Sequence, residues 1–167
     1  YDSIVPSIMN SVLKKANENH VLLVAGAGNS RQIISQEDIS RSKNKTKMVL
    51  PYPAALNQVA IGKDVIICVG ALDEKQDDIA EFSNRGYIID IYAPGTEIKS
   101  MTIGHDYFEV SSDGTSMSVG FVSRVAAKIM SKNTSISVKE IKDCLLKGND
   151  KIGDKPVLQS NKTLPCI

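Results

Sequence analysis

The sequence predicts an α/β fold built on a mostly parallel sheet, and three features of the chain support this prediction. Residues 21–25 and 65–69 are short, continuous apolar runs, which are typical of strands buried on both faces. Residues 4–16 carry apolar side chains at helical spacing and lead into the first run, as in half of a βαβ unit. A second helical pattern, from Ser116 to residue 130, is apolar almost all the way round and is therefore expected to be buried.

The remaining elements can be assigned in chain order. Ser3 can cap the first helix, which ends at the polar residues 17–19. Segment 31–48 is polar and lacks a convincing period, so we expect an exposed loop or surface insertion there. Further short strands are expected near 88–92 and 107–110, and a final amphipathic helix over about 138–146.

Composition limits the function classes. The 167 residues fit one globular domain, and the formal charge of +1 with scattered lysines disfavours a nucleic-acid partner. The apolar runs are strand-sized, so no membrane span is predicted. The three cysteines, Cys68, Cys144 and Cys166, have no metal-type spacing, and their odd number allows at most one internal disulfide. Cys68 lies within an apolar strand and is interpreted as a small core residue.

A glycine-containing turn, Gly-Ala-Gly-Asn-Ser at 26–30, follows the first strand. A dinucleotide-binding fingerprint would need a third glycine where Arg31 stands, and a helix where the sequence is a polar segment. Phosphate binding is therefore not supported. The alternative is that the glycines only turn the chain, but neither interpretation explains the asparagine at position 29.

A second turn, at 113–118, leads into the long apolar helix. A serine at position 116 has its hydroxyl beside unpaired backbone N–H groups and the positive end of the helix dipole. Such an environment favours the negative charge that develops on a carbonyl oxygen during acyl transfer. The local pattern alone also fits a serine that caps the helix. A nucleophile elbow of the α/β-hydrolase type is absent, because Ser118 occupies the place of its second glycine.

Taken together, these segments resemble the subtilisin-like serine peptidases. The similarity extends in family order and spacing from residue 1 to about residue 147 and rests on several separate blocks. The matching blocks are 21–29, 52–54 with 65–72, 82–86 with 91–95, and the Gly-Thr-Ser-Met sequence at 114–117.

The resemblance implies a three-layer subtilisin-like fold, with residues 1–167 as the C-terminal portion of a single peptidase domain. It implies a serine endopeptidase in which Ser116 is the nucleophile. The Asn29 side chain and the Ser116 backbone N–H would form the oxyanion hole. The aspartate and histidine of the triad would lie upstream of this chain, in an N-terminal half that acts as its partner. One wall of the pocket for the residue before the scissile bond would be lined by Ala25, Gly26, Ala27 and Gly28.

Two histidines of the chain are poor substitutes for the missing base. His20 precedes a strand on the side of the sheet away from the carboxyl ends, where α/β sites form. His105 lacks the glycine-threonine context of the family's histidine. This chain alone is therefore expected to be inactive. No cofactor is required by these residues, although the resemblance allows calcium, and it implies peptide or protein substrates and a secreted or extracytoplasmic location.

The helix after the nucleophile departs from the family pattern. Gly120, Phe121 and Arg124 stand where the family normally has a proline, a histidine and a helix-packing glycine. A long cation on a helix that should be buried must reach solvent or find a carboxylate. The alternative hypothesis is therefore a pseudopeptidase that keeps the fold as a binding or scaffolding module without turnover.

Overall fold

The computed structural model describes residues 4–42, 51–58, 62–101, 109–147 and 150–158. At its centre lies a parallel sheet of three strands in the order β1-β3-β5. The strands are β1 (Leu23–Gly26), β3 (Ile66–Leu72) and β5 (Ile91–Pro94). Among the described residues, β1 has a strand partner on one side only, so it is an edge of this sheet.

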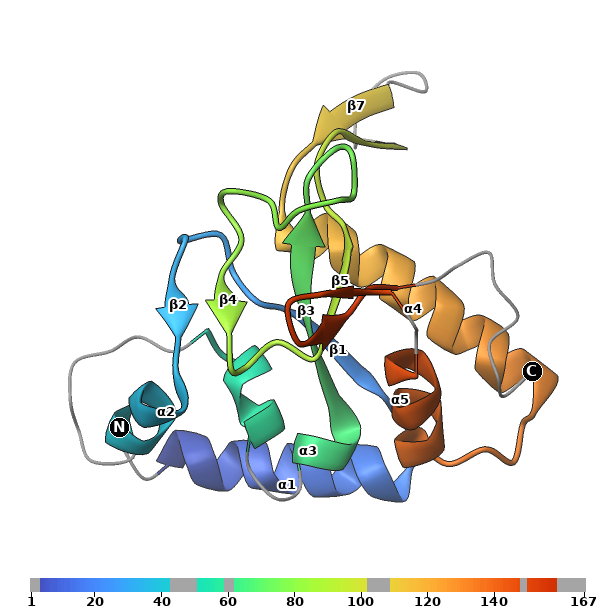
Figure 1. Cartoon of the computed structure of the whole chain (residues 1–167). Coiled ribbons are helices and arrows are strands. Elements are labelled where there is room, and N and C mark those ends of the chain that lie inside the picture. Colours follow the sequence, from blue (N-terminus) through green and yellow to red (C-terminus); the bar gives the residue numbers. More distant parts are fainter. Residues whose placement is uncertain (1–3, 43–50, 59–61, 102–108, 148–149, 159–167) are drawn as a thin grey trace.

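Helices cover both faces of the sheet and complete a three-layer α/β fold, as the sequence predicts (Figure 1). On one face lie α1 (Ile4–Glu18) and the 3-10 helix η1 (Ala54–Gln58), whereas the short α3 (Gly62–Val65) leads directly into β3 and contacts both α1 and α5. On the other face, α4 (Thr115–Lys132) packs against all three strands, and α5 (Val138–Leu146) packs beside it. Figure 1 shows the first turn of α4 near the carboxyl ends of the strands.

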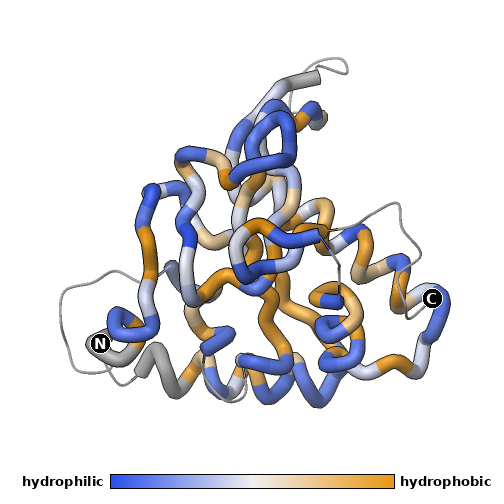
Figure 2. Tube along the Cα trace, in the orientation of Figure 1, coloured by the Kyte–Doolittle hydropathy of each residue, from blue (hydrophilic) through white to orange (hydrophobic). Residues whose placement is uncertain are grey.

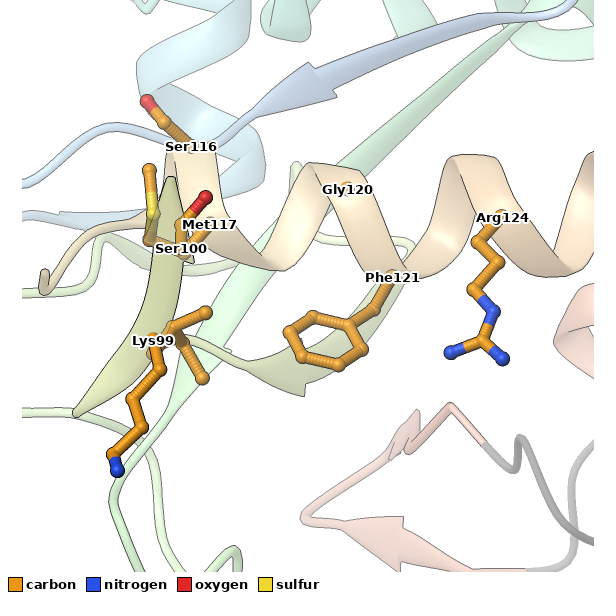
Figure 3. Close-up of a pocket in the computed structure, with 8 residues that line it drawn as sticks. Lys99, Ser100, Ser116, Met117, Gly120, Phe121 and Arg124 are labelled. Carbon is orange, nitrogen blue, oxygen red and sulfur yellow. The ribbon is translucent and has the colours of Figure 1, made fainter. Parts of the chain in front are cut away.

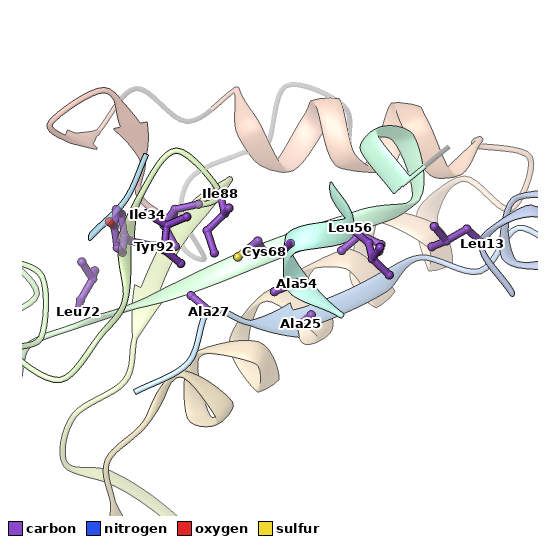
Figure 4. Close-up of a cluster of buried hydrophobic side chains, with 13 residues drawn as sticks. Leu13, Ala25, Ala27, Ile34, Ala54, Leu56, Cys68, Leu72, Ile88 and Tyr92 are labelled. Atoms are coloured by element: carbon purple, nitrogen blue, oxygen red, sulfur yellow. The ribbon is translucent and has the colours of Figure 1, made fainter. Parts of the chain in front are cut away.

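The alternation of side chains along β3 divides the core in two. Every residue of β3 is buried. Ile66 and Cys68 face the cluster formed with α1 and η1, which is drawn in Figure 4. Ile67 and Val69 face the cluster formed with α4 and α5. Figure 2 shows the hydrophobic residues concentrated along this central strand and on the inward sides of the helices. A strand buried on both faces must be continuously apolar, which explains the run at 65–69.

Smaller elements surround this frame. A parallel pair, β2 (Ile33–Ile34) and β4 (Arg85–Gly86), lies to one side of the sheet. An antiparallel pair, β6 (Ile98–Met101) and β7 (Glu109–Ser112), projects beyond the start of α4. A last short pair is formed by β8 (Lys151–Ile152) and β9 (Lys155–Pro156). No helix in the described part of the chain is long and apolar enough to span a bilayer.

The structure corrects two sequence-based expectations. Residues 31–42 are not an irregular loop, because they contain β2 and the helix α2 (Gln36–Ser42). Ile34 is fully buried there, and a two-residue strand is too short to show any periodicity. Residues 43–48 lie outside the described part, and whether the segment is a family insertion stays a prediction. The helix α4 is buried on one side only, since Gly120, Ser123, Arg124 and Ala127 are exposed.

Strand boundaries also differ in part from the predicted ones. The strand expected near 88–92 begins at Ile91, while Ile88 and Ile89 lie buried in the preceding turn. The strand expected at 107–110 is found as β7, of which residues 109–112 are described. Residues 107 and 108 lie outside the described part.

A buried ion pair connects α5 to the sheet. Lys142, which is 6% exposed, donates to the carboxylate of Asp90 at 3.2 Å and to the backbone oxygens of Lys63 and Ile66. The same carboxylate oxygen of Asp90 accepts from Asn57 Nδ2 at 2.7 Å and from the Cys68 N–H at 2.8 Å. Besides their contact with each other, the two charged groups thus have two donors and two acceptors, which come from η1, α3 and β3.

The described cysteines have different environments. Cys68 is a free thiol, and burial raises its pKa far above the usual range of a thiol. This agrees with its interpretation as a small core residue. Cys144 is disulfide-bonded, whereas Cys166 lies outside the described residues. Burial also raises the pKa of Tyr92 to about 12.

Candidate active site

Ser116 is the second residue of α4, and its side chain is exposed. The helix is capped by the backbone of Gly114, whose φ of 150° favours glycine, so Ser116 is not the N-cap that the local pattern allowed. The neighbouring N–H groups are both used: that of Thr115 donates to Asn29 Oδ1 and that of Met117 to the Gly114 oxygen. The Ser116 N–H and hydroxyl have no partner among the described residues.

The orientation of the Asn29 amide follows from its contacts with Thr115. Asn29 Oδ1 accepts hydrogen bonds from the Thr115 N–H and from Thr115 Oγ1, each at 3.0 Å. A backbone N–H can only donate, so the atom that it meets must be the amide oxygen. The other terminal atom is therefore the nitrogen, and a methyl group on Gly114 would come within 3.2 Å of it. Asn29 thus presents two N–H donors beside the turn that carries Ser116.

Thr115 holds this arrangement together. Its hydroxyl accepts from the Gly28 N–H at 3.1 Å while donating to Asn29 Oδ1. The side chain is 2% exposed and sits so close to β1 that a methyl group on Gly26 would lie 2.8 Å from Thr115 Oγ1. Sequence reasoning gave Thr115 no role of its own, although it lies within the Gly-Thr-Ser-Met block. The structure shows that Thr115 connects the turn at residues 26–30, called here the asparagine turn, to the start of α4.

Asn84 fixes the asparagine turn from the other side. Its Nδ2 donates to the Ala27 oxygen at 2.8 Å, and its Oδ1 accepts from the N–H groups of Ser30 and Gln32. Its own N–H donates to the Gly28 oxygen at 2.9 Å. Gly28 has a φ of +95°, and a methyl group there would meet Asn84 Nδ2 at 2.7 Å. Asn84 lies in one of the family-like blocks, but only the fold shows that it positions residues 27–32.

The residues expected to line a substrate pocket divide into two kinds. Ala25 and Ala27 are buried within the core, so their side chains cannot line an open pocket. Gly26 and Gly28 are half-buried. A wall built from 25–28 would therefore present backbone to the substrate, and its role as a pocket wall stays a prediction. The alternation of a strand explains this, because both alanines point to the same face.

A pocket of about 350 Å³ lies between the first turns of α4 and strand β6 (Figure 3). Figure 3 shows Phe121 and Arg124 projecting from α4 to the same side, with Lys99 and Ser100 on β6. Ser116 lies at one end of the pocket. The lining residues are Ile98, Lys99, Ser100, Ser116, Met117, Gly120, Phe121 and Arg124.

Comparison with known proteins decides the family. The sequence matches the subtilase family of peptidases, Peptidase_S8, over residues 1–160. The chain belongs to the subtilase family.

Individual relatives agree with this assignment. Subtilisin DY of Bacillus licheniformis is 30% identical over 146 residues, which are 87% of this chain and 46% of the relative. A subtilisin-like protease of Coccidioides posadasii is 38% identical over 112 residues, or 66% of this chain and 27% of the relative. A solved structure of the subtilase cytotoxin assembly matches 91% of this chain and 51% of that chain, with a TM-score of 0.71 and 27% identity. This subtilase chain thus spans about half, or less, of the length of these proteins.

The described part of this subtilase chain places no histidine beside Ser116. His20 lies at the opposite end of β1, next to Ser123 and Met130 of α4. Ser123 is two helical turns beyond Ser116, which corresponds to about 10 Å along the axis. His105 lies outside the described residues. Ser118 is fully buried, and its hydroxyl donates to the Ala93 oxygen at 3.1 Å, so it is occupied by the fold.

The subtilase resemblance allows a bound calcium ion. Within the described residues, no group of three or more His, Cys, Asp or Glu side chains could hold a metal ion. No step of the proposed mechanism depends on calcium.

Proposed function

We propose that this chain supplies the nucleophile and the oxyanion-binding groups of a subtilisin-like serine endopeptidase that acts on peptides or proteins. The observation that supports the proposal most strongly is the fixed orientation of the Asn29 amide, whose oxygen is held by Thr115. Its N–H groups lie beside a serine whose hydroxyl and N–H have no other partner in the described part. Asn29 is exposed, so its amide hydrogens are accessible to the carbonyl oxygen of a bound substrate.

The reaction begins with attack of Ser116 Oγ on the carbonyl carbon of the scissile bond. The hydroxyl proton passes to a general base, and the carbonyl oxygen becomes negatively charged as the C–O bond forms. When the C–N bond breaks, the base returns the proton to the amine that leaves. Water then attacks the ester on Ser116 and releases the acid, by the same proton transfers. The base is a histidine, oriented by an aspartate, on a segment outside this chain.

Asn29 and the start of α4 act on the charged intermediate. Asn29 Nδ2 and the Ser116 N–H donate to the oxyanion, and the dipole of α4 adds positive potential at its N-terminus. Because Thr115 and Asn84 hold the donors in place before substrate binds, little reorganisation is needed during the reaction. Gly26 and Gly28 offer backbone to the substrate residue before the scissile bond.

A second candidate function is a pseudopeptidase that binds without turnover. The exposed face of α4, with Gly120 and Arg124 in place of the family residues, is the observation that favours it. In that case Ser116 and Asn29 would persist as parts of a rigid turn only.

The proposed location is outside the cytoplasm. Cys144 is disulfide-bonded, and disulfides persist mainly in oxidising compartments. This supports the secreted or extracytoplasmic location that the resemblance implies.

Hydrolysis of a chromogenic peptide by the complete protein tests the proposed function. The Ser116→Ala variant should lose turnover by about 10⁶-fold, the size of the effect of losing the serine in subtilisin itself. Ser123→Ala removes an exposed hydroxyl from the same helix and should keep full activity. Hydrolysis at the same measurable rate by the Ser116→Ala variant and the unaltered protein would refute the role of Ser116 as nucleophile, whereas no hydrolysis by either protein would favour the pseudopeptidase.

A further inference from the structure

Arg124 is a charged residue without a partner on the exposed side of α4. Its side chain is exposed, and its guanidinium makes no hydrogen bond or ion pair with any described residue. It nevertheless lines the same pocket as Ser116, with the half-buried Met117 and Phe121 between them. Arginine presents five donors in a planar fork that matches a carboxylate, so an acidic group is its natural partner.

Gly120 leaves the middle of this surface open. A methyl group at Gly120 would contact nothing within 4 Å, and no side chain from α4 fills the space above it. The result is a hollow of about 350 Å³ that is lined by the apolar side chains of Met117 and Phe121, and also by the cations Arg124 and Lys99. A glycine costs about 1 kcal/mol relative to alanine inside a helix. A helix commonly carries a glycine where another segment of chain must approach it closely.

The chemistry of Ser116 requires a segment at this end of α4. A general base must come within hydrogen-bond reach of Ser116 Oγ, and His20, the histidine in the described part, is at the other end of β1. This chain also covers only 46% of subtilisin DY and 51% of the cytotoxin structure, so about half of each relative has no counterpart here. A segment that brings a base to Ser116 would lie beside the first turns of α4, where the pocket is.

We propose that Arg124 anchors the segment that carries the general base, through an ion pair with a carboxylate on that segment, while apolar side chains of the segment fill the pocket over Met117 and Phe121. The inference rests on the proposed function and specifies the partner of its site. Arg124 lies about 12 Å along the helix from Ser116, so it acts as a positioning residue and does not touch the reacting atoms. Its role is to fix the angle at which the base reaches the serine.

The test uses the complete protein and three single variants. Arg124→Met keeps the length and the apolar stem of the side chain but removes the charge. Arg124→Lys keeps the charge without the bidentate fork. Lys128→Met removes an exposed cation one helical turn farther along α4, and it serves as the matched control. For each protein, the thermal midpoint is measured at low and high salt, and kcat and KM are measured with a neutral peptide and with an acidic one.

Three results are expected. Arg124→Met should lower the thermal midpoint by about 5 °C or more, because the carboxylate of the partner segment loses its cation. Its kcat should fall by up to about 100-fold while KM stays unchanged, as for a base that is slightly misplaced. Arg124→Lys should recover part of both losses, because it restores the charge, and Lys128→Met should match the unaltered protein.

Two other outcomes would overturn the inference. If Arg124→Met keeps the midpoint and kcat of the unaltered protein, no anchoring ion pair exists. If its only effect is a raised KM for peptides with acidic residues, the pocket is a substrate subsite instead. The thermal midpoints do not depend on turnover, so a failure of the inference is distinguishable from a failure of the proposed function.

Discussion

Replacement of Asn29 by aspartate should abolish most of the activity of the complete protein while the fold remains intact. Aspartate keeps an oxygen that accepts from the Thr115 N–H and hydroxyl, so the turn is preserved. It has no N–H to donate to the oxyanion, and it adds a negative charge beside the one that develops. Loss of the equivalent donor in subtilisin itself costs about 10²- to 10³-fold in kcat, and the aspartate should cost at least as much.

The measurement is kcat and KM with a chromogenic peptide, accompanied by a thermal melt. Asn29→Ala serves as the companion variant, because it removes the donor without adding charge and should show the smaller loss. KM should change little in both, since the donors act on the transition state. If Asn29→Asp turns over at the rate of the unaltered protein, the side chain is not an oxyanion donor.

Replacement of Lys142 by methionine should strongly destabilise the fold. Lys142 is 6% exposed and is the cation that pairs with Asp90 in the described structure. Without it, the carboxylate keeps only the Asn57 and Cys68 donors in a buried site. Removing one partner of a buried pair costs about 3–5 kcal/mol, or roughly 10 °C in the thermal midpoint. Urea denaturation of the complete protein measures the loss.

Two further variants show whether the buried charge is the cause. Adding Asp90→Asn to Lys142→Met removes the orphaned carboxylate and should recover part of the stability. Lys139→Met removes an exposed pair with Asp143 on the same helix and should leave the midpoint almost unchanged. The stability of the Asp90→Asn variant alone gives the comparison. If adding Asp90→Asn to Lys142→Met lowers the stability by as much as Asp90→Asn lowers that of the unaltered protein, this explanation is contradicted.

The sheet and its helices were predictable because local pattern and tertiary burial agree there. β3 is apolar throughout since both of its faces are covered, and this could be seen in residues 65–69. The elements in 31–42 were missed because β2 has two residues and α2 has seven, too few to show a period. The sequence overestimates the burial of α4, because its apolar pattern includes Met130, which is exposed, and Phe121, which is only half-buried.

Of the residues that build the site, only Ser116 and Asn29 could be predicted from the sequence. Ser116 and Asn29 could be proposed from motif blocks, but their placement in a shared site depends on contacts between residues 86 positions apart in the chain. The positioning roles of Thr115 and Asn84 depend on long-range hydrogen bonds of the same kind, which cannot be predicted from the local sequence. The resemblance implies that residues 25–28 line a pocket wall, and burial of the Ala25 and Ala27 side chains in the core leaves only their backbone for that role.

Labelling of the complete protein with a serine-directed fluorophosphonate tests the central claim most directly. The reagent should modify Ser116, as shown by mass spectrometry of the peptides, and leave Ser118 unmodified, because the Ser118 hydroxyl is buried against the Ala93 oxygen. Labelling should be much slower in the Asn29→Ala variant, because phosphonylation also places negative charge in the oxyanion hole. A folded, stable protein that resists the reagent at Ser116, or labels at an unchanged rate without Asn29, would contradict the assignment of this chain to a working serine peptidase.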